Sequence, residues 1–228
     1  MVLNLAKSLR MSRLPLIYKM LLLATFLPAL LLTSLSARAY AAVACDLNDP
    51  DRDVPRLFPE STSYRTKYLS FRQQGGDALL RNVQSRLGDK YLALYAPIDV
   101  PYTLYEIYNG VKKVGYIHGV NQKGQFGGIQ VFMAQDMSGR IKTFYLQKVT
   151  GRSAGKFRDA KFYKMFTGVS LKDFETYDPA SAKGSGRIAE IRSPAPEMET
   201  DFHGILRGLK KNLILMDEFV FSATKGNP

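Results

Sequence analysis

The sequence has few of the side chains that build disulfides and metal sites. It contains one cysteine, Cys45, two histidines, His118 and His203, and no tryptophan. A single cysteine cannot form an internal disulfide, and no two of these three residues have the spacing of a metal-ligand pair. The sequence also lacks the Gly-x-Ser-x-Gly pattern of a hydrolase nucleophile, and "GSGR" at 184–187 lacks the Gly-Lys-Ser/Thr end of a phosphate-binding loop. We therefore do not expect the chain to be an enzyme by itself.

Acidic residues are absent from positions 1–44, which contain five basic residues. Four of these precede an apolar run at 20–35 that is interrupted by Pro28. The run is shorter than the roughly 20 residues that a bilayer-spanning helix needs. Small residues follow, and Ala-x-Ala triplets end at Ala39, Ala41 and Ala44. This layout predicts a signal peptide at 1–44, with an uncleaved N-terminal membrane anchor as the alternative.

The position of Cys45 directly after "AVA" raises a second possibility for this region. A cysteine at such a position can carry a lipid anchor, whereas the simpler interpretation is an incidental residue beside a cleavage site. In each case the sequence predicts a periplasmic or exported protein, either free or anchored to the cytoplasmic membrane.

The charge of the remaining chain is moderately basic. Taking the five basic residues of 1–44 from the total of 32 leaves 27, against 20 acidic residues, which is a net charge of +7. Such a surface favours anionic partners, including membrane headgroups, phosphates and acidic proteins. The basic residues are scattered, and an exported protein rarely meets nucleic acid. We therefore expect no nucleic-acid partner, and membrane-surface contact remains open.

The first part of the mature chain reads as an N-terminal extension at 45–101. Its Asp- and Pro-rich start at 45–65 predicts an irregular segment, and "GDALLRNVQSRLG" at 76–88 predicts one short amphipathic helix that stops at Gly88. "APIDVP" at 96–101 reads as a linker into the main domain at 102–220, and 221–228 is a tail.

Two hairpins are predicted at the start of the main domain. Asn109-Gly110 lies between two β-prone stretches within 102–120 and suits a tight turn. A glycine-bearing turn at 121–128 follows. Apolar residues then alternate along 129–134, as in a strand with one buried face; "DMSG" at 136–139 is a turn, and 140–149 returns. Sequential hairpins pair as a meander, so we expect about four antiparallel strands.

The second half of the domain reads as short helices and loops. We expect a loop at 150–157, a helix at 158–168, a loop at 176–186, a strand at 187–192 and a long final helix. In that helix one apolar stripe is formed by Phe202, Ile205, Leu206, Leu209, Leu213 and Met216. The predicted fold class is therefore α+β, an antiparallel β meander of hairpins packed with short helices.

Three stretches in this order resemble the FMN-binding domain family. They are "YEIYNGVKKVGYIHGV", "GGIQVFMAQDMSGRIKTFYLQKVTG" and "FRDAKFYKMFTGVSL", and the resemblance covers roughly 102–216. The family comprises exported and membrane-associated electron carriers, including the G and C subunits of sodium- or proton-coupled electron-transport complexes and the nitrous-oxide-reductase regulator. The resemblance implies a fold similar to the FMN-binding domain and a role in membrane electron transport.

The resemblance also implies where flavin chemistry would lie. Family members carry Ser-Gly-Ala-Thr before the last helix, and the threonine hydroxyl is esterified to FMN phosphate. The N–H groups and positive dipole end of a helix suit a phosphate. Here Ser193-Pro194-Ala195-Pro196 stands at that position, and proline has no hydroxyl to esterify. Acidic residues follow, and we expect Thr200 or Asp201 to cap the helix. The covalent flavin is therefore predicted to be lost.

Non-covalent FMN, or no cofactor at all, remains as the alternative. The candidate cofactor-binding residues that match the family pattern are Tyr116, Gly127, Gly128, Thr150, Gly151, Arg152 and Ser193. Further basic and aromatic candidates are Lys156, Arg187, Arg192, Phe126 and Tyr145. Two functions follow: an electron-transfer module beside membrane electron-transport or accessory proteins, or a flavin-less interaction or assembly module that keeps only the fold.

Overall fold

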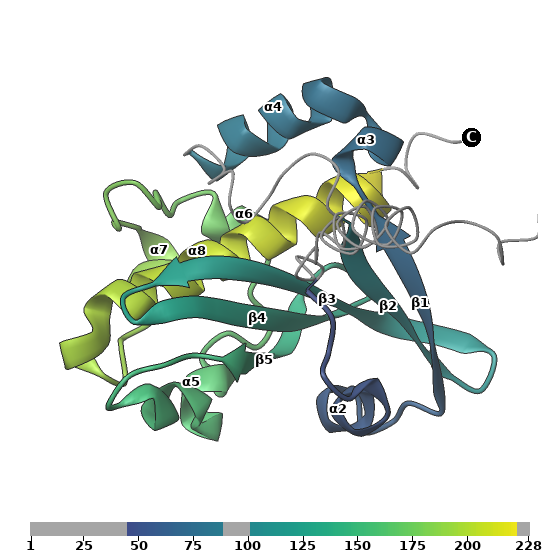
Figure 1. Ribbon diagram of the computed structural model, residues 1–228, viewed down its shortest axis with the longest axis horizontal. Helices are drawn as coiled ribbons and strands as arrows, with labels where there is room; N and C mark the ends of the chain where they lie inside the picture. Colours follow the sequence, from purple (N-terminus) through teal and green to yellow (C-terminus); the bar gives the residue numbers. More distant parts are fainter. Residues whose placement is uncertain (1–44, 89–100, 223–228) are drawn as a thin grey trace, which may run out of the picture. The chain divides into compact units, whose positions relative to one another are not determined.

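The computed structural model describes residues 45–88 and 101–222. Within these ranges the chain forms a five-stranded antiparallel sheet in which each strand pairs with the next in sequence (Figure 1). The strands are β1 (Ser63–Leu69), β2 (Tyr102–Asn109), β3 (Lys112–Gly124), β4 (Gly127–Asp136) and β5 (Ile141–Lys148). The predicted α+β class and β meander are therefore confirmed.

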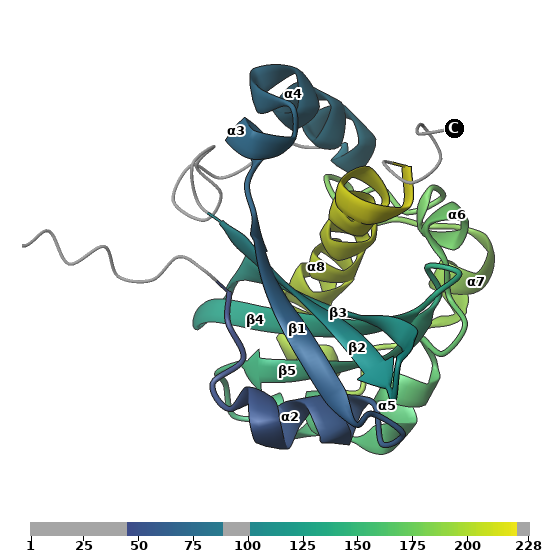
Figure 2. The same cartoon turned by 90° about the vertical axis from the view of Figure 1, so that its right-hand side faces the viewer.

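Helices cover both faces of the sheet. Helix α8 (Glu199–Met216) packs along β3 and β4 on one face, and α2 (Pro50–Leu57) lies on the other face beside β5 (Figure 2). The other helical segments are α3 (Phe71–Gln74), α4 (Gly76–Leu87), η2 (Ala154–Arg158), α5 (Ala160–Lys164), α6 (Leu171–Phe174), α7 (Gly186–Glu190), η3 (Pro196–Met198) and η4 (Asp217–Phe221).

Each face of the sheet buries its own hydrophobic core. On the α8 side, Val131 and Met133 of β4 belong to the core that includes Leu209. On the α2 side, Phe132 and Ala134 belong to a second core with residues of α2. The prediction that this strand has one buried face was therefore wrong. The second face is covered by a helix that the alternation along β4 could not reveal.

The prediction of an irregular segment at 45–65 was also wrong. This segment contains α2 and the start of β1. The Asp49 side chain accepts a hydrogen bond from the main-chain N–H of Arg52 at 3.2 Å, and Pro50 lies in the first turn, where its missing N–H costs nothing. The sheet has five strands rather than about four because β1 pairs with β2. As an exposed edge strand, β1 lacks the apolar alternation from which strands are recognised.

Two short segments also differ from their predictions. The strand predicted at 187–192 is replaced by α7, in which Ile188 alone is buried, so the segment has too little pattern to separate helix from strand. The loop predicted at 150–157 ends in the 3₁₀ helix η2. The turn of the first hairpin lies one residue later than expected, because Asn109 pairs with Lys112.

The predictions for the longer helices are confirmed. Helix α4 ends at Gly88, which has a left-handed φ of 88° and closes the helix as a C-cap. All six residues of the predicted stripe on α8 are buried. The extension predicted to hold one short helix holds α2, α3, α4 and β1.

Several predictions concern residues that the structure does not describe. They are the signal segment at 1–44 and all of the linker at 96–101 except Pro101. Of the helices within 45–88 and 101–222, none is both long and apolar enough to span a lipid bilayer.

Candidate functional site

Three segments that are distant in sequence meet at the N-terminal end of α8. They are the β3–β4 turn at 124–128, the loop at 150–157 and the connector at 193–198 that leads into the helix (Figure 1). The turn is fixed to the helix because the main-chain N–H of Gln125 donates to Asp201 Oδ1 at 2.9 Å. We call these three segments, with the first turn of α8, the α8-start site. Of the candidates that match the family pattern, it contains all except Tyr116.

Two glycines of the α8-start site have conformations that other residues seldom adopt. Gly127 has a φ of 134° and Gly151 a φ of 148°. A Cβ built on Gly151 would lie 2.4 Å from Met198 Cε and 3.2 Å from Phe126 Cδ2. The atoms that lie closest to Gly151 therefore belong to the buried side chain of Met198 in the connector.

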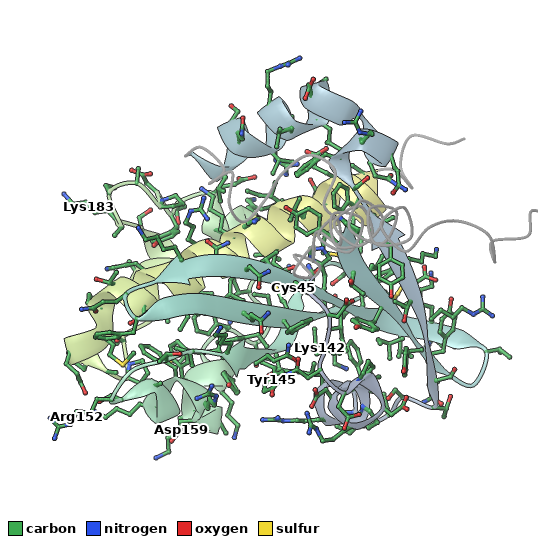
Figure 3. All side chains as sticks on the ribbon, in the orientation of Figure 1. Cys45, Lys142, Tyr145, Arg152, Asp159 and Lys183 are labelled. Carbon is green, nitrogen blue, oxygen red and sulfur yellow. The ribbon has the colours of Figure 1, made fainter. Side chains whose placement is uncertain are left out.

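The cations and hydroxyls of the loop at 150–157 contact the connector. Lys156 Nζ lies 3.0 Å from Glu197 Oε1, and the Ser153 hydroxyl donates to the same oxygen. These contacts lower the pKa of the Glu197 carboxyl to about 2. The hydrogen bond from Ser153 has the largest effect, followed by the main-chain N–H of Glu197 and by Lys156. Thr150 and Arg152 are exposed, and Arg152 extends away from the protein (Figure 3).

The connector has the local structure that its two prolines favour. Pro196 is the first residue of η3, a position that needs no N–H donor. The Ser193 hydroxyl accepts a hydrogen bond from the main-chain N–H of Ala195 at 3.2 Å, and Ala195 is fully buried. Pro196 is thus well placed as a helix start, but it offers no oxygen to a phosphate. The residues at the start of α8 do not fit a covalently attached FMN.

The expected helix cap is also absent. No side chain caps the first turn of α8, so neither Thr200 nor Asp201 has the predicted role. Asp201 is buried and holds the β3–β4 turn through Gln125 instead. Its second carboxylate oxygen has no hydrogen-bond partner.

Four of the predicted residues lie elsewhere or point to other partners. The Tyr116 ring packs against Phe221, 5.6 Å between centroids, beyond the C-terminal end of α8. The Tyr145 ring, labelled in Figure 3, lies under the Arg56 guanidinium at 4.4 Å, on the α2 face. Arg187 donates to the main-chain oxygen of Thr167 and Arg192 to that of Ala189. The structure therefore does not bring Tyr116 and Tyr145 into the α8-start site.

A cavity lies on each side of Ser193 and Arg192. One, of about 380 Å³, is bounded by the apolar side chains of Phe162, Met165 and Pro194 and by the basic residues Lys156 and Lys161. The other, of about 350 Å³, lies between the connector, α7, α8 and the loop at 177–184. Both volumes are at the lower end of the range for small-molecule sites.

The sequence placed the Glu197 carboxylate at the helix start, but it did not indicate that Met198 or Ser153 would belong to the site or that Glu197 would contact the loop at 150–157. Glu197 and Lys156 are 41 positions apart, and their contact depends on how the loop and the connector are placed by β5 and α8. The charge signs alone, basic in the loop and acidic in the connector, are a signal that could have suggested the pair.

Comparisons of the chain with models of known protein families and with curated proteins gave no match. The function is therefore inferred from the site itself.

Proposed function

We propose that the protein is an exported accessory of membrane electron transport, built on a scaffold like that of the FMN-binding domain, which carries no covalent flavin. The observation that carries this proposal is the start of α8. Pro196 stands where an ester would require a hydroxyl, and Glu197 already accepts from Ser153 and Lys156.

Electrostatics at the start of α8 supports the same conclusion. A phosphate is favoured by the free N–H groups and the dipole of a helix N-terminus. Here Glu197, Glu199 and Asp201 place three carboxylates at that end, which repel a second anion. The scaffold is therefore better suited to protein contacts than to holding a phosphate, and the basic surface favours an acidic partner.

The covalent part of the proposal is tested by mass spectrometry of the protein purified from an exporting host that contains a flavin transferase. The expected result is a colourless protein whose peptide covering 193–201 has its unmodified mass. As a positive control, Pro196→Thr combined with Pro194→Gly restores the hydroxyl and the glycine of the family pattern. FMN mass on any residue of 193–201 in the unaltered protein would contradict the proposal.

The accessory role is tested separately in the protein's own host. A tagged full-length chain, isolated in mild detergent, is expected to co-purify with subunits of a membrane electron-transport complex. Deletion is expected to lower the electron-transfer activity of that complex. Normal activity and assembly in the deletion strain would overturn the accessory role.

A second candidate function is non-covalent binding of FMN in the cavity bounded by Phe162 and Met165. Its apolar wall and its three lining cations, Lys156, Lys161 and Arg192, against one lining carboxylate, Asp159, favour this alternative. Titration with FMN, followed by quenching of flavin fluorescence, distinguishes the two. Saturable quenching that Lys161→Gln weakens and Lys164→Gln leaves unchanged would support binding there. If FMN at about 100 times the protein concentration shows no quenching, non-covalent binding is excluded and the flavin-free module stands.

A further inference from the structure

The cavity of about 350 Å³ neighbours the candidate flavin cavity and shares Arg192 and Ser193 with it. We propose that it is a binding site for a small carboxylate with an apolar body. Its walls come from α7, the connector, the N-terminal half of α8 and the loop that precedes α7. The site does not depend on whether the protein binds flavin or acts in electron transport.

One wall of the cavity is held in a single, unusual conformation. Ala182 lines the cavity and, among the described residues other than glycine, it alone has a positive φ, of 57°. The loop around it is closed by a main-chain hydrogen bond from Asp178 N–H to the Lys183 oxygen at 2.7 Å. The Asp178 carboxylate also accepts from the N–H of Ala180 at 2.9 Å and from the Ser181 hydroxyl at 2.6 Å. Backbone conformations of this kind persist where the surroundings determine them, and they gather at ligand sites.

Part of the cavity lining is apolar. Ile188, Phe202 and Leu206 form this part and are all buried. Apolar walls with a few converging polar groups are typical of small-molecule sites. The volume admits a small molecule but not a dinucleotide.

The polar groups of the cavity form a short chain around His203. The ring nitrogen Nε2 of His203 lies 3.2 Å from Glu199 Oε1, and Nδ1 lies 3.5 Å from the Tyr177 hydroxyl. Tyr177 is itself buried, and its main-chain oxygen accepts from Lys210 Nζ at 2.7 Å. The imidazole is therefore held from both sides, with its orientation set before a ligand arrives.

The cavity has one cation that can pair with a carboxylate. Of its lining residues, Arg192, Glu199 and His203 can carry charge. Arg192 offers a guanidinium, which binds carboxylates through two parallel hydrogen bonds. The Glu199 carboxylate offsets part of this positive charge and repels a dianion such as a phosphate monoester more strongly than a carboxylate. A monoanionic head beside Arg192 and an apolar body on Phe202 satisfy both parts of the cavity.

The test uses sodium benzoate as the probe and benzamide, its uncharged analogue, as the comparison. Because the chain has only two histidines, the ring signals of His203 can be followed by NMR, with the buried His118 as internal reference. Benzoate is expected to shift the His203 signals saturably, and benzamide to bind at least about tenfold more weakly. Equal affinity for the two probes, or no shift of His203, would overturn the proposal.

Variants locate the probe. Arg192→Gln is expected to weaken benzoate binding about tenfold or more, because a charged hydrogen-bond partner is lost. Arg187→Gln is the matched control, since Arg187 bonds to Thr167 and does not line the cavity. Ala189→Trp fills this cavity, whereas Lys161→Gln affects only the neighbouring one. Benzoate binding that survives Ala189→Trp but is weakened by Lys161→Gln would place the probe in the wrong cavity and refute the site.

Discussion

The two ends of α8 are held by interactions of very different kinds. At its start the connector contacts the neighbouring loop through Glu197 and Lys156, whose side chains are 50% and 52% exposed. Toward its C-terminal end, Asn212 is fully buried and its amide bonds to the His118 ring and to the main-chain oxygens of His118 and Val131. The buried end fixes the helix on the sheet. At the start, the buried side chains of Met198 and Asp201 position the loop and the turn, and the exposed ion pair adds to these contacts.

The largest effect is expected from removing the buried amide. Asn212→Ala leaves His118 Nδ1 without its partner and removes the amide donor from two main-chain oxygens of the sheet, and an orphaned buried group costs roughly 1–3 kcal/mol. We therefore expect the free energy of unfolding to fall by about 3 kcal/mol, measured by urea denaturation. Thr200→Ala, at an exposed position of the same helix, is the control and should change it by less than about 0.5 kcal/mol. A loss below about 1 kcal/mol for Asn212→Ala would show that the two ends of α8 do not differ as described.

A second large effect is expected from protonation of the same buried cluster. Burial, with a smaller contribution from Lys211, lowers the pKa of His118 to about 4, although its hydrogen bond to Asn212 acts in the opposite direction. The unfolded chain, with an ordinary histidine pKa of about 6.5, binds the proton more readily between pH 6.5 and 4. The contribution of neutral, buried His118 to the free energy of unfolding is therefore fully present above pH 6.5. It is lost as the pH falls toward 4, by about 2 kcal/mol at pH 5 and about 3 kcal/mol in all.

Urea denaturation at pH 7 and pH 5 measures this loss. Between pH 7 and pH 5 the carboxylates contribute little to the change in stability. The groups whose pKa is lowered by folding, such as Glu106 and Asp173, have ordinary pKa values of only 4.5 and 3.8 in the unfolded chain. NMR of the folded protein gives an independent check. Titration of the His118 ring near pH 6.5 in the folded protein would contradict both the burial and the predicted pH dependence.

A smaller effect is expected at the start of α8. Gly151→Ala places a side chain on a backbone with a φ of 148° and against the end of Met198. Because the methionine can move aside, the cost is mainly conformational, and we expect a loss of about 1–2 kcal/mol. Gly155→Ala in the same loop has no atom within 4 Å of the new Cβ and should be neutral or slightly stabilising. Equal effects of the two substitutions would remove the argument that Gly151 is required by its conformation.

The sequence predicted the elements whose pattern is long or whose turns are marked. The stripe along α8, the Gly88 stop of α4 and the two hairpins were all recognised from local spacing. The sequence could not indicate β1, whose exposed residues pair with β2 through the main chain alone. Helix α2 was missed because its Asp- and Pro-rich composition also suits an irregular segment, although Asp49-Pro50 is a helix-start signal.

The site was predicted only in part, for a related reason. Gly127, Gly128, Thr150, Gly151, Arg152 and Ser193 lie at one end of α8, and their role in cofactor binding stays a prediction. Tyr116 and Tyr145 were chosen for their rings, and the register of the sheet directs those rings to Phe221 and Arg56. The contacts of Glu197 and Met198 depend on tertiary placement, which no local pattern encodes.

The smallest effect is expected for the ion pair itself. Lys156→Gln removes the cation from Glu197, but exposed ion pairs gain little because water and salt screen them and because two long side chains must be ordered. The thermal midpoint should therefore shift by less than about 2 °C, which is the scale of a few tenths of a kcal/mol in a domain of this size. This shift should become smaller still between 0.05 and about 0.5 M salt, because the Debye length falls from above 10 Å to well below it and the exposed pair is screened. Arg86→Gln is the matched comparison at the other end of α8, since Arg86 pairs with both Asp217 and Glu218 and is only 29% exposed. A larger drop for Lys156→Gln than for Arg86→Gln would reverse the contrast between the two ends, because the start of α8 would then be the part that holds the helix in place.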